Sequence, residues 1–309
     1  MSAGTPGHAP TPAPVLPTDA PSGLVYASLA YAGWGLLPLY FQLLAFLGPV
    51  EIVIHRVLFS LLLLLPLALW LGRPGWIGEL LKQPKVLALY ALTAALIAGN
   101  WLIFVWAVNS QQVVEASLGY FINPIVVVLA GSLILKERLR PRQWAAVALA
   151  AVGVAVLTVG TGRLPLIALA LTATFATYGV LRKLGPLGAL EGLTLETAWL
   201  FPVALIGLGV LLALGQAAAL DASAGQWALI ALAGPLTALP LLGFAAGARR
   251  IRLATLGLLQ YISPTMQLAI GVLLGGEPFG GPRQLGFGLI WAALAIYSAD
   301  SWWAARGRR

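Results

Sequence analysis

Residues 119–124 read GYFINP and residues 259–264 read LQYISP, so each of two apolar stretches carries a small polar residue directly before a proline. Thirteen residues after each proline comes a glutamate, Glu137 in the first copy and Glu277 in the second. An Arg-Gln pair then opens the next apolar stretch in both copies. This shared order of polar residues is more specific than the Leu, Ala and Gly matches around it, and it predicts an internal repeat.

Ten apolar stretches, each long enough to cross a bilayer as a helix, follow one another along the chain. They cover residues 24–47, 50–71, 86–108, 112–135, 142–160, 164–181, 190–214, 227–247, 253–274 and 284–303. The repeat unit contains five of these stretches, and because five is odd the second copy must enter the membrane from the opposite side. The sequence therefore predicts an all-α integral membrane protein with ten transmembrane helices arranged as two inverted five-helix repeats.

The basic residues fall almost entirely on one face when successive loops are assigned alternately to the two sides of the membrane. Of the 18 Lys and Arg residues, Arg163 and Arg283 lie on the other face, Arg56 lies inside an apolar stretch, and the rest share one face. Such a bias marks the cytoplasmic side of a membrane. We therefore expect both termini in the cytoplasm.

The chain divides into two halves with short tails. Residues 1–23, rich in Pro, Ala, Thr and Gly, are expected to form a disordered cytoplasmic tail. Residues 24–160 form the first five-helix half and residues 161–303 the second. Residues 304–309 form a basic cytoplasmic tail.

Composition excludes several classes of function. The chain is 60% hydrophobic and only 9% charged, far below the roughly 25% charged residues of a soluble domain. Its net charge of +8 resides in short loops, which argues for membrane orientation and against nucleic-acid binding. The absence of cysteine from the sequence excludes disulfides and thiolate metal sites.

Four ionisable residues lie near the outer ends of two predicted helices. Glu51 and His55 are four residues apart and share a helix face, whereas Arg56 points elsewhere. Glu115, which begins the fourth helix at the same side, is the expected partner of Arg56. The alternatives are that Arg56 presents a cation to a carboxylate-bearing substrate, that it is a structural tie, or that it extends toward the interface.

Glu196 lies near the inner end of the seventh predicted helix, as the inverted counterpart of Glu51. Carboxylates inside membranes serve as proton relays in transporters, so a coupling role is one interpretation. An interhelical hydrogen bond is the other.

The two prolines of the repeat leave backbone carbonyls without partners. Pro124 frees the carbonyl of Tyr120, and Pro264 frees that of Gln260. Such carbonyls need partners within a bilayer, and polar neighbours such as Asn123 can supply them. We expect hinges lining the transport cavity; the alternative is kinks satisfied by neighbouring helices. The repeat places Tyr261 beside this region.

Asn100 and Trp101 lie in the third predicted helix, where Trp101 and Phe104 share a face. They are candidates for stacking on an aromatic substrate. Packing within the bundle is the alternative interpretation.

Several segments resemble the RarD branch of the EamA-type drug/metabolite transporters. They are AYAGWGLLPLYF (30–41), EIVIHR (51–56), NWLIFVWAVN (100–109), EASLGYFINP (115–124), LKERLRPRQW (135–144), LTLET (193–197) and LGLLQYISPT (256–265). The resemblance runs from about residue 24 to about residue 303. It implies ten transmembrane helices in two EamA-like halves, a bacterial inner (plasma) membrane and an exporter-like role.

These observations together predict a secondary transporter that exports small organic metabolites or amphipathic drugs by alternating access. One alternative is a lipid-carrier flippase; another, from a different class, is a membrane-embedded enzyme or sensor. The scattered acidic residues argue against an enzyme, because catalysis needs converging acid, base or metal ligands. We expect no cofactor and no metal, contacts with a small-molecule substrate and membrane lipid, and a monomer or homodimer.

Overall fold

The computed structural model describes residues 20–306 except 74, 136–139, 249 and 252–258. Within this part of the chain the secondary structure is entirely helical. The helices are α1 (Pro21–Leu43), α2 (Pro49–Leu71), α3 (Trp76–Leu81), α4 (Pro84–Asn109), α5 (Val113–Leu135), α6 (Pro141–Thr161), α7 (Leu166–Leu184), α8 (Ala189–Ala213), η1 (Ala218–Asp221), α9 (Ala224–Ala231), α10 (Ala233–Ala248), α12 (Ile262–Ala269), the π-helix η2 (Ile270–Leu274) and α13 (Pro282–Arg306).

Six helical segments are long and apolar enough to cross a membrane. They are α1, α2, α4, α6, α8 and the segment Ala224–Phe244, which joins α9 to most of α10. Shorter apolar helices cover Val113–Val126, Leu166–Arg182 and Ile262–Leu274. The prediction of an all-helical protein with several spans is confirmed for the described residues.

The helices differ from the predicted stretches at three places. The short helix α3 lies in a segment expected to be a loop. The stretch expected at 227–247 begins earlier and is divided at Leu232 into α9 and α10. The stretch expected at 253–274 has a turn at Gln260 and Tyr261, and α12 begins only at Ile262. The described residues therefore do not form ten uninterrupted helices, and the count of ten spans stays a prediction.

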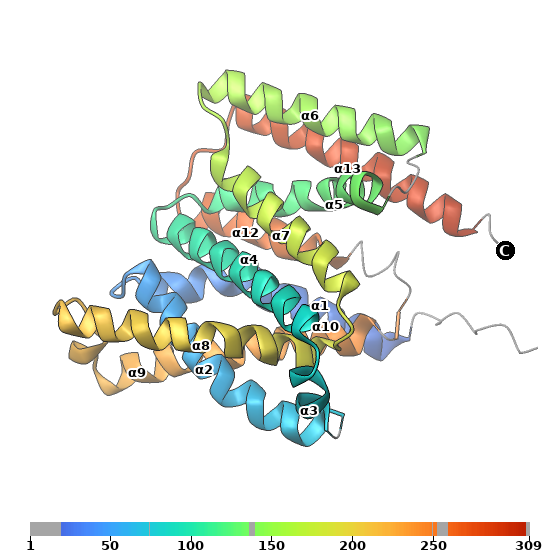
Figure 1. Ribbon diagram of the computed structural model, residues 1–309. Helices are drawn as coiled ribbons and strands as arrows, with labels where there is room; N and C mark the ends of the chain where they lie inside the picture. Colours follow the sequence, from blue (N-terminus) through green and yellow to red (C-terminus); the bar gives the residue numbers. More distant parts are fainter. Residues whose placement is uncertain (1–19, 74, 136–139, 249, 252–258, 307–309) are drawn as a thin grey trace, which may run out of the picture.

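The helices run between two ends of the bundle (Figure 1). We call the end at which α1 begins and α13 finishes the terminal end, and the opposite end the distal end. The terminal end also carries α3 and the turn between α7 and α8. The described part of the chain therefore begins and finishes at the same end of the bundle.

Several packed helix pairs have a second pair that corresponds to them. The second pair is obtained when each helix is replaced by the corresponding helix of the other predicted half. Helix α1 packs against α10, and α7 packs against α4. In the same way, the packing of α5 against α7 corresponds to that of α12 against α1. The packing of α2 against α10 corresponds to that of α8 against α4. Helix α6 packs against α13, α2 against α8, and α5 against α12, each against its own predicted counterpart. Two halves related by a two-fold axis would produce this pattern.

Close backbone approach between α5 and α7 depends on Gly119. A Cβ atom at Gly119 would lie 2.8 Å from the carbonyl oxygen of Ala168, and the Thr172 hydroxyl donates to the Gly119 carbonyl at 2.7 Å. Small residues at such contacts let membrane helices pack closely.

We expect Gly119→Ala to destabilise the folded protein by about 1–3 kcal/mol, because the added methyl meets backbone atoms that cannot move aside. Gly99→Ala is the matched control, since a Cβ atom at Gly99 in α4 meets nothing within 4 Å. Thermal unfolding of both purified variants measures the difference. Equal stability would show that α5 and α7 adjust freely.

Candidate functional site

Arg56 lies in the apolar helix α2 and is only 5% exposed. Its Nε donates a hydrogen bond of 2.9 Å to the Thr237 hydroxyl on α10. Its guanidinium carbon lies 4.1 Å from the centre of the Trp101 ring and 5.7 Å from that of Phe41. Among the described residues, no carboxylate lies within ion-pair distance of Arg56. The cation is therefore held by a hydroxyl and by aromatic faces.

Aromatic side chains extend this site toward α5 and α7. Phe104 packs edge-on against Phe41 and against Tyr120, with ring centres 6.1 Å and 5.6 Å apart. The Tyr120 hydroxyl donates to Asn100 Oδ1 at 3.4 Å. Asn100 Nδ2 in turn donates to the Leu171 carbonyl at 3.0 Å. The structure thus brings together four of the predicted residues, and we call the group Arg56, Trp101, Tyr120, Asn100 and Thr237 the Arg56 site.

The predicted pairing of Arg56 with Glu115 is wrong. Glu115 Oε1 instead accepts the backbone N–H of Ile167 at 3.0 Å, at the beginning of α7. The first N–H groups of a helix lack intrahelical partners and are costly to leave bare in a membrane. Glu115 satisfies one of them, so its carboxylate is committed to α7.

Glu51 and His55 lie toward the distal end of α2. The two carboxylate oxygens of Glu51 accept the backbone N–H groups of Ala218 and Ala219 at 3.1 Å and 3.0 Å. His55 Nδ1 lies 3.0 Å from the Glu51 carbonyl oxygen, and its ring packs edge-on against Trp227. These contacts tie α2 to the segment between α8 and α9.

Glu191, rather than the predicted Glu196, holds the position in α8 that Glu51 holds in α2. Glu51 and Glu191 are each the third residue of their helices, α2 and α8. Glu191 Oε1 accepts the backbone N–H of Arg73 at 3.2 Å, in the segment after α2. Each glutamate therefore ties the start of its helix to a connection in the other half.

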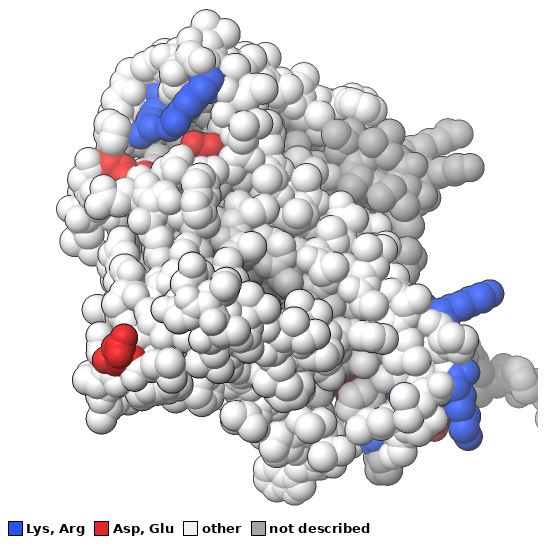
Figure 2. All heavy atoms as spheres, turned by 60° about the vertical axis from the view of Figure 1, so that its left-hand side comes forward, with Lys and Arg blue, Asp and Glu red and all other residues white. Residues whose placement is uncertain are grey.

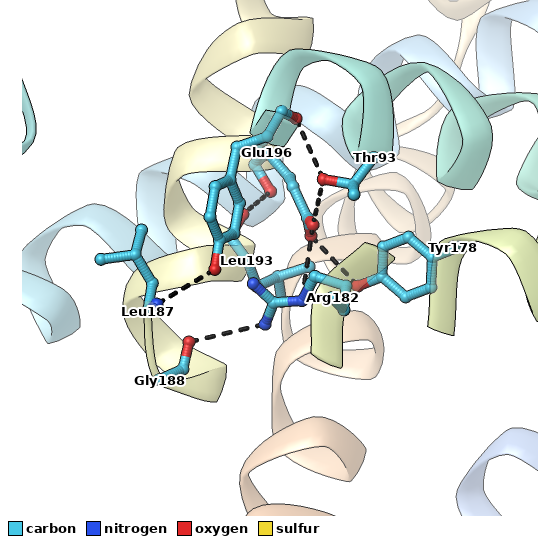
Figure 3. Close-up of polar contacts among 9 residues, drawn as sticks. Thr93, Tyr178, Arg182, Leu187, Gly188, Leu193 and Glu196 are labelled. Atoms are coloured by element: carbon cyan, nitrogen blue, oxygen red, sulfur yellow. Dashed lines mark hydrogen bonds and ion pairs between the residues drawn. The ribbon is translucent and has the colours of Figure 1, made fainter. Parts of the chain in front are cut away.

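Glu196 belongs to a separate cluster on α4, α7 and α8 (Figure 3). Its side chain is completely buried. The Thr93 hydroxyl donates to its Oε1 at 2.7 Å, and the Tyr178 hydroxyl donates to its Oε2 at 3.1 Å. Arg182 Nε lies 3.5 Å from Oε1. Phe175 connects this cluster to the Arg56 site, because its ring centre lies 6.0 Å from that of Tyr178 and 6.1 Å from that of Tyr120.

The two prolines of the repeat lie in different settings. Pro124 is inside α5, as expected of a hinge. Pro264 is in the first turn of α12, after the turn at Gln260 and Tyr261. Residues 252–258 lie outside the described residues, so the predicted hinge at Pro264 stays a prediction. A first-turn N–H would be unsatisfied in any case, and proline is tolerated there. Tyr261 stacks on Phe121, with ring centres 6.4 Å apart.

Asn123, directly before the first proline, is buried in α5. Its Oδ1 has no hydrogen-bond partner in the described part of the chain. The sequence-based expectation that it serves a freed carbonyl or the substrate stays a prediction.

We expect Pro124→Ala to slow transport several-fold, because it restores a backbone N–H and straightens a ladder that can bend at low cost. Pro264→Ala should have little effect, because the same change at a helix start closes no interior hydrogen bond. Initial rates over a range of substrate concentrations compare the two. Equal rates for the wild type and both variants would identify both prolines as packing features.

Sequence reasoning missed the residues that complete both clusters. Thr93 and Thr237 are isolated hydroxyls in apolar helices, and the periodicity of such helices does not identify their buried face. Arg182 was counted among the basic loop residues, yet it lies within α7 and reaches Glu196. Its position four residues after Tyr178, on one helix face, was the available signal.

Metal binding finds no support within the described ranges, which contain no group of three His, Asp or Glu side chains that could hold an ion. What the two clusters offer is a buried cation among aromatic rings and a buried carboxylate among hydroxyls.

Comparisons with known proteins agree over nearly the whole chain. The EamA-like transporter family matches residues 21–159. A protein named RarD from Streptomyces exfoliatus is 47% identical over 288 residues, which cover 93% of this chain and 91% of that protein. An uncharacterized transporter of Pseudomonas aeruginosa is 45% identical over 287 residues, covering 92% and 95% of the two chains. A crystal structure with 18% identity and a TM-score of 0.56 covers 89% of this chain and 96% of that chain, and this likeness concerns the fold alone.

Proposed function

Because the chain belongs to the EamA-like transporter family, and within it to the branch of proteins named RarD, we propose that it is a secondary transporter that exports small organic metabolites or amphipathic drugs across the bacterial inner membrane by alternating access. The family and the several apolar helices make it a multi-pass membrane transporter rather than an enzyme. Substrate class, direction and mechanism are the parts that we propose.

Alternating access between two inverted five-helix halves is supported by the pairing of the helices. The most closely packed pairs that join different helices of the two halves, α1·α10, α5·α7 and α2·α10, each have an exchanged partner pair. Glu51 and Glu191 repeat the relation at the level of single side chains. In transporters with inverted repeats, rocking of one half against the other exposes the central site to each side in turn.

The proposed orientation puts the terminal end in the cytoplasm. The basic residues Arg73 and Lys82 belong to the connection between α2 and α4, and Lys85 to the first turn of α4, all at the terminal end. On the face drawn in Figure 2, the described charged side chains gather toward the two sides of the view, and a broad uncharged band lies between them. An excess of Lys and Arg is typical of cytoplasmic loops.

Single cysteines should report this orientation without background, because the chain has no cysteine. Ser110→Cys lies in an exposed turn at the distal end and should react with an impermeant thiol reagent added to intact cells. Gln83→Cys lies at an exposed position before α4 and should react only after permeabilisation. The reverse pattern would overturn the orientation.

The buried cation of Arg56 is the observation that carries the proposed substrate class. Removing a charge from water is costly unless a partner compensates it, and the described residues give Arg56 a hydroxyl and aromatic faces but no carboxylate. An anionic group on a substrate would supply the missing charge through paired hydrogen bonds. Trp101 and Tyr120 would contact an apolar or aromatic body. We infer an amphipathic substrate that carries a carboxylate or a similar anionic group.

Uptake into inverted membrane vesicles tests this proposal. Vesicles that contain the protein should accumulate labelled aromatic carboxylates faster than vesicles without it, because the cytoplasmic face is then outside. Neutral amides of the same compounds are the matched control and should not be accumulated. Equal uptake of carboxylates and amides would contradict the role of Arg56 as an anion site.

A further inference from the structure

The Glu196 cluster has features that the proposed substrate site does not use. Its carboxylate is completely buried, and its partners come from two other helices, Thr93 from α4 and both Tyr178 and Arg182 from α7 (Figure 3). A charged carboxylate at such a place is retained at a cost unless it is fully compensated. The groups around Glu196 can form hydrogen bonds with its protonated form as well as with its ionised form.

The Thr93 hydroxyl is placed to serve both protonation states of Glu196. Its oxygen lies 2.7 Å from Glu196 Oε1 and 3.1 Å from the carbonyl oxygen of Tyr90. A hydroxyl can both donate and accept. When Glu196 is ionised, Thr93 donates to it. When Glu196 carries a proton, the acid donates to Thr93, and the Thr93 hydrogen turns to the Tyr90 carbonyl.

The Arg182 guanidinium has other contacts besides the ion pair with Glu196. Its Nη2 donates to the Gly188 carbonyl at 3.5 Å, and its guanidinium lies 5.1 Å from the centre of the Tyr90 ring. Its side chain is 17% exposed, whereas that of Glu196 is 1% exposed. The Nη1 atom occupies the space left by the missing side chain of Gly192. Nη1 has no hydrogen-bond partner in the described part of the chain, so Nη2 and the Tyr90 ring hold the guanidinium when the ion pair opens.

The other elements that pack on α8 bring no further charge to Glu196 within the described ranges. Helices α2 and α10 meet α8 through Leu64 and Ala238, which pack on Leu193. The titratable groups that face Glu196 are thus Tyr90, Tyr178 and Arg182. On α8 itself, Glu191 is paired with Arg73 at 3.2 Å.

A cavity at the terminal end approaches this cluster through Leu187, without reaching it. The cavity has a volume of about 120 Å³ and is lined by residues that include Gln83, Val86 and Leu187. The backbone N–H of Leu187 donates to the Tyr90 hydroxyl at 3.2 Å. The Tyr90 ring in turn lies under Arg182. Leu187 and Tyr90 therefore separate water in this cavity from the ion pair.

From this geometry we propose that Glu196 is a proton-binding site, in which a proton taken from the terminal end binds a carboxylate oxygen and releases Arg182. The proton comes from hydronium in the water at that end: one O–H bond of hydronium breaks and leaves a water molecule, and one O–H bond forms on the Glu196 carboxylate. Released Arg182 loosens the contact between α7 and α8, so the same event couples proton movement to rearrangement of the bundle. The coupling rests on the proposed transport function, whereas the proton binding does not.

Infrared difference spectroscopy of the purified full chain in lipid tests the proton binding without any substrate. Lowering the pH should produce the carbonyl band of a protonated buried carboxyl group in the wild type. The band should be missing in Glu196→Gln and retained in the control Glu191→Gln. A band of wild-type intensity in Glu196→Gln would overturn the proposal.

Gly192→Ala tests the part of Arg182 without changing either charged residue. The added methyl takes the place of Arg182 Nη1 and should push the guanidinium off Glu196. Without the positive charge of Arg182 beside it, Glu196 should bind its proton at higher pH. The midpoint of its titration should rise by about one pH unit for each tenfold gain in proton affinity. This variant keeps the proposal open to refutation if Glu196→Gln fails to fold. A titration midpoint that is unchanged or lower would contradict it.

Transport with and without a pH gradient tests the coupling. Glu196→Gln should still exchange labelled aromatic carboxylates across the vesicle membrane, but their accumulation should no longer respond to the gradient. A response equal to that of the wild type would refute the coupling. If the wild type moves none of these compounds while the infrared band still depends on Glu196, the proposed substrate class fails and the proton site stands.

Discussion

Arg56→Ala should abolish transport and leave a folded protein. The substitution removes the only cation of the Arg56 site, so an anionic substrate loses its charged partner. The fold should survive, because a buried charge without a described carboxylate partner costs folding free energy and its removal lowers that cost. Vesicle uptake measures transport, and size-exclusion chromatography with thermal unfolding measures the fold.

Two further variants make this result specific to the guanidinium. Arg56→Lys should recover only part of the activity, because an ammonium cannot form paired hydrogen bonds to a carboxylate. Arg56→Ala combined with Glu115→Ala should remain inactive, since Glu115 accepts the Ile167 N–H and does not touch Arg56. Restored activity in the double variant would show that Arg56 serves only as a tie between helices.

The helical class could be predicted from the sequence because it follows from a strong signal, whereas Arg56, Trp101, Asn100 and Tyr120 were separate candidates and only the structure brings them together. Long apolar stretches permit few structures in a membrane. A polar residue within such a stretch must face protein, so the buried positions of Arg56 and Asn100 could be expected.

The partners of the glutamates could not be predicted in the same way. Counting residues from the helix start placed Arg56 and Glu115 at similar depth, and opposite charges then suggested a pair. The structure shows a different use of carboxylates at helix starts. Glu51, Glu115, Glu191 and Glu277 each accept backbone N–H groups, often from another half of the chain. An unsatisfied N–H has no signature in the sequence, because every residue except proline has one.

The Glu196 cluster was missed for a related reason. Glu196 was identified, but its cation was assigned to a loop, because Arg182 stands at the end of an apolar stretch. The helix α7 extends to Leu184, and the long side chain of Arg182 turns back to the buried carboxylate. Long basic side chains reach one turn or more along a helix, so the boundary of the apolar stretch does not locate the charge.

Glu277→Ala should open the distal end of the bundle. The two carboxylate oxygens of Glu277, which lies between η2 and α13, accept the N–H groups of Val113 and Val114 at 2.6 Å and 3.0 Å. Gly271 of η2 lies against the same helix start, where a Cβ atom would be 3.0 Å from Val114. Hydrogen bonds to a charged group contribute about 1.5–3 kcal/mol each. Losing even one of them should therefore shift the equilibrium between the closed and the open arrangement toward the open one by about tenfold or more.

The reaction of Val114→Cys with a thiol reagent measures this opening, because Val114 is 3% exposed while the contact is closed. Its alkylation rate should rise about tenfold or more when Glu277→Ala is added, by the conversion of about 1.4 kcal/mol to a factor of ten. Glu51→Ala is the matched control, since it also deprives two backbone N–H groups at the distal end of their carboxylate but leaves α5 and η2 in contact. An equal rise with Glu51→Ala would mean general loosening. No rise with Glu277→Ala would mean that the packing of Gly271 on α5 closes this end without the glutamate.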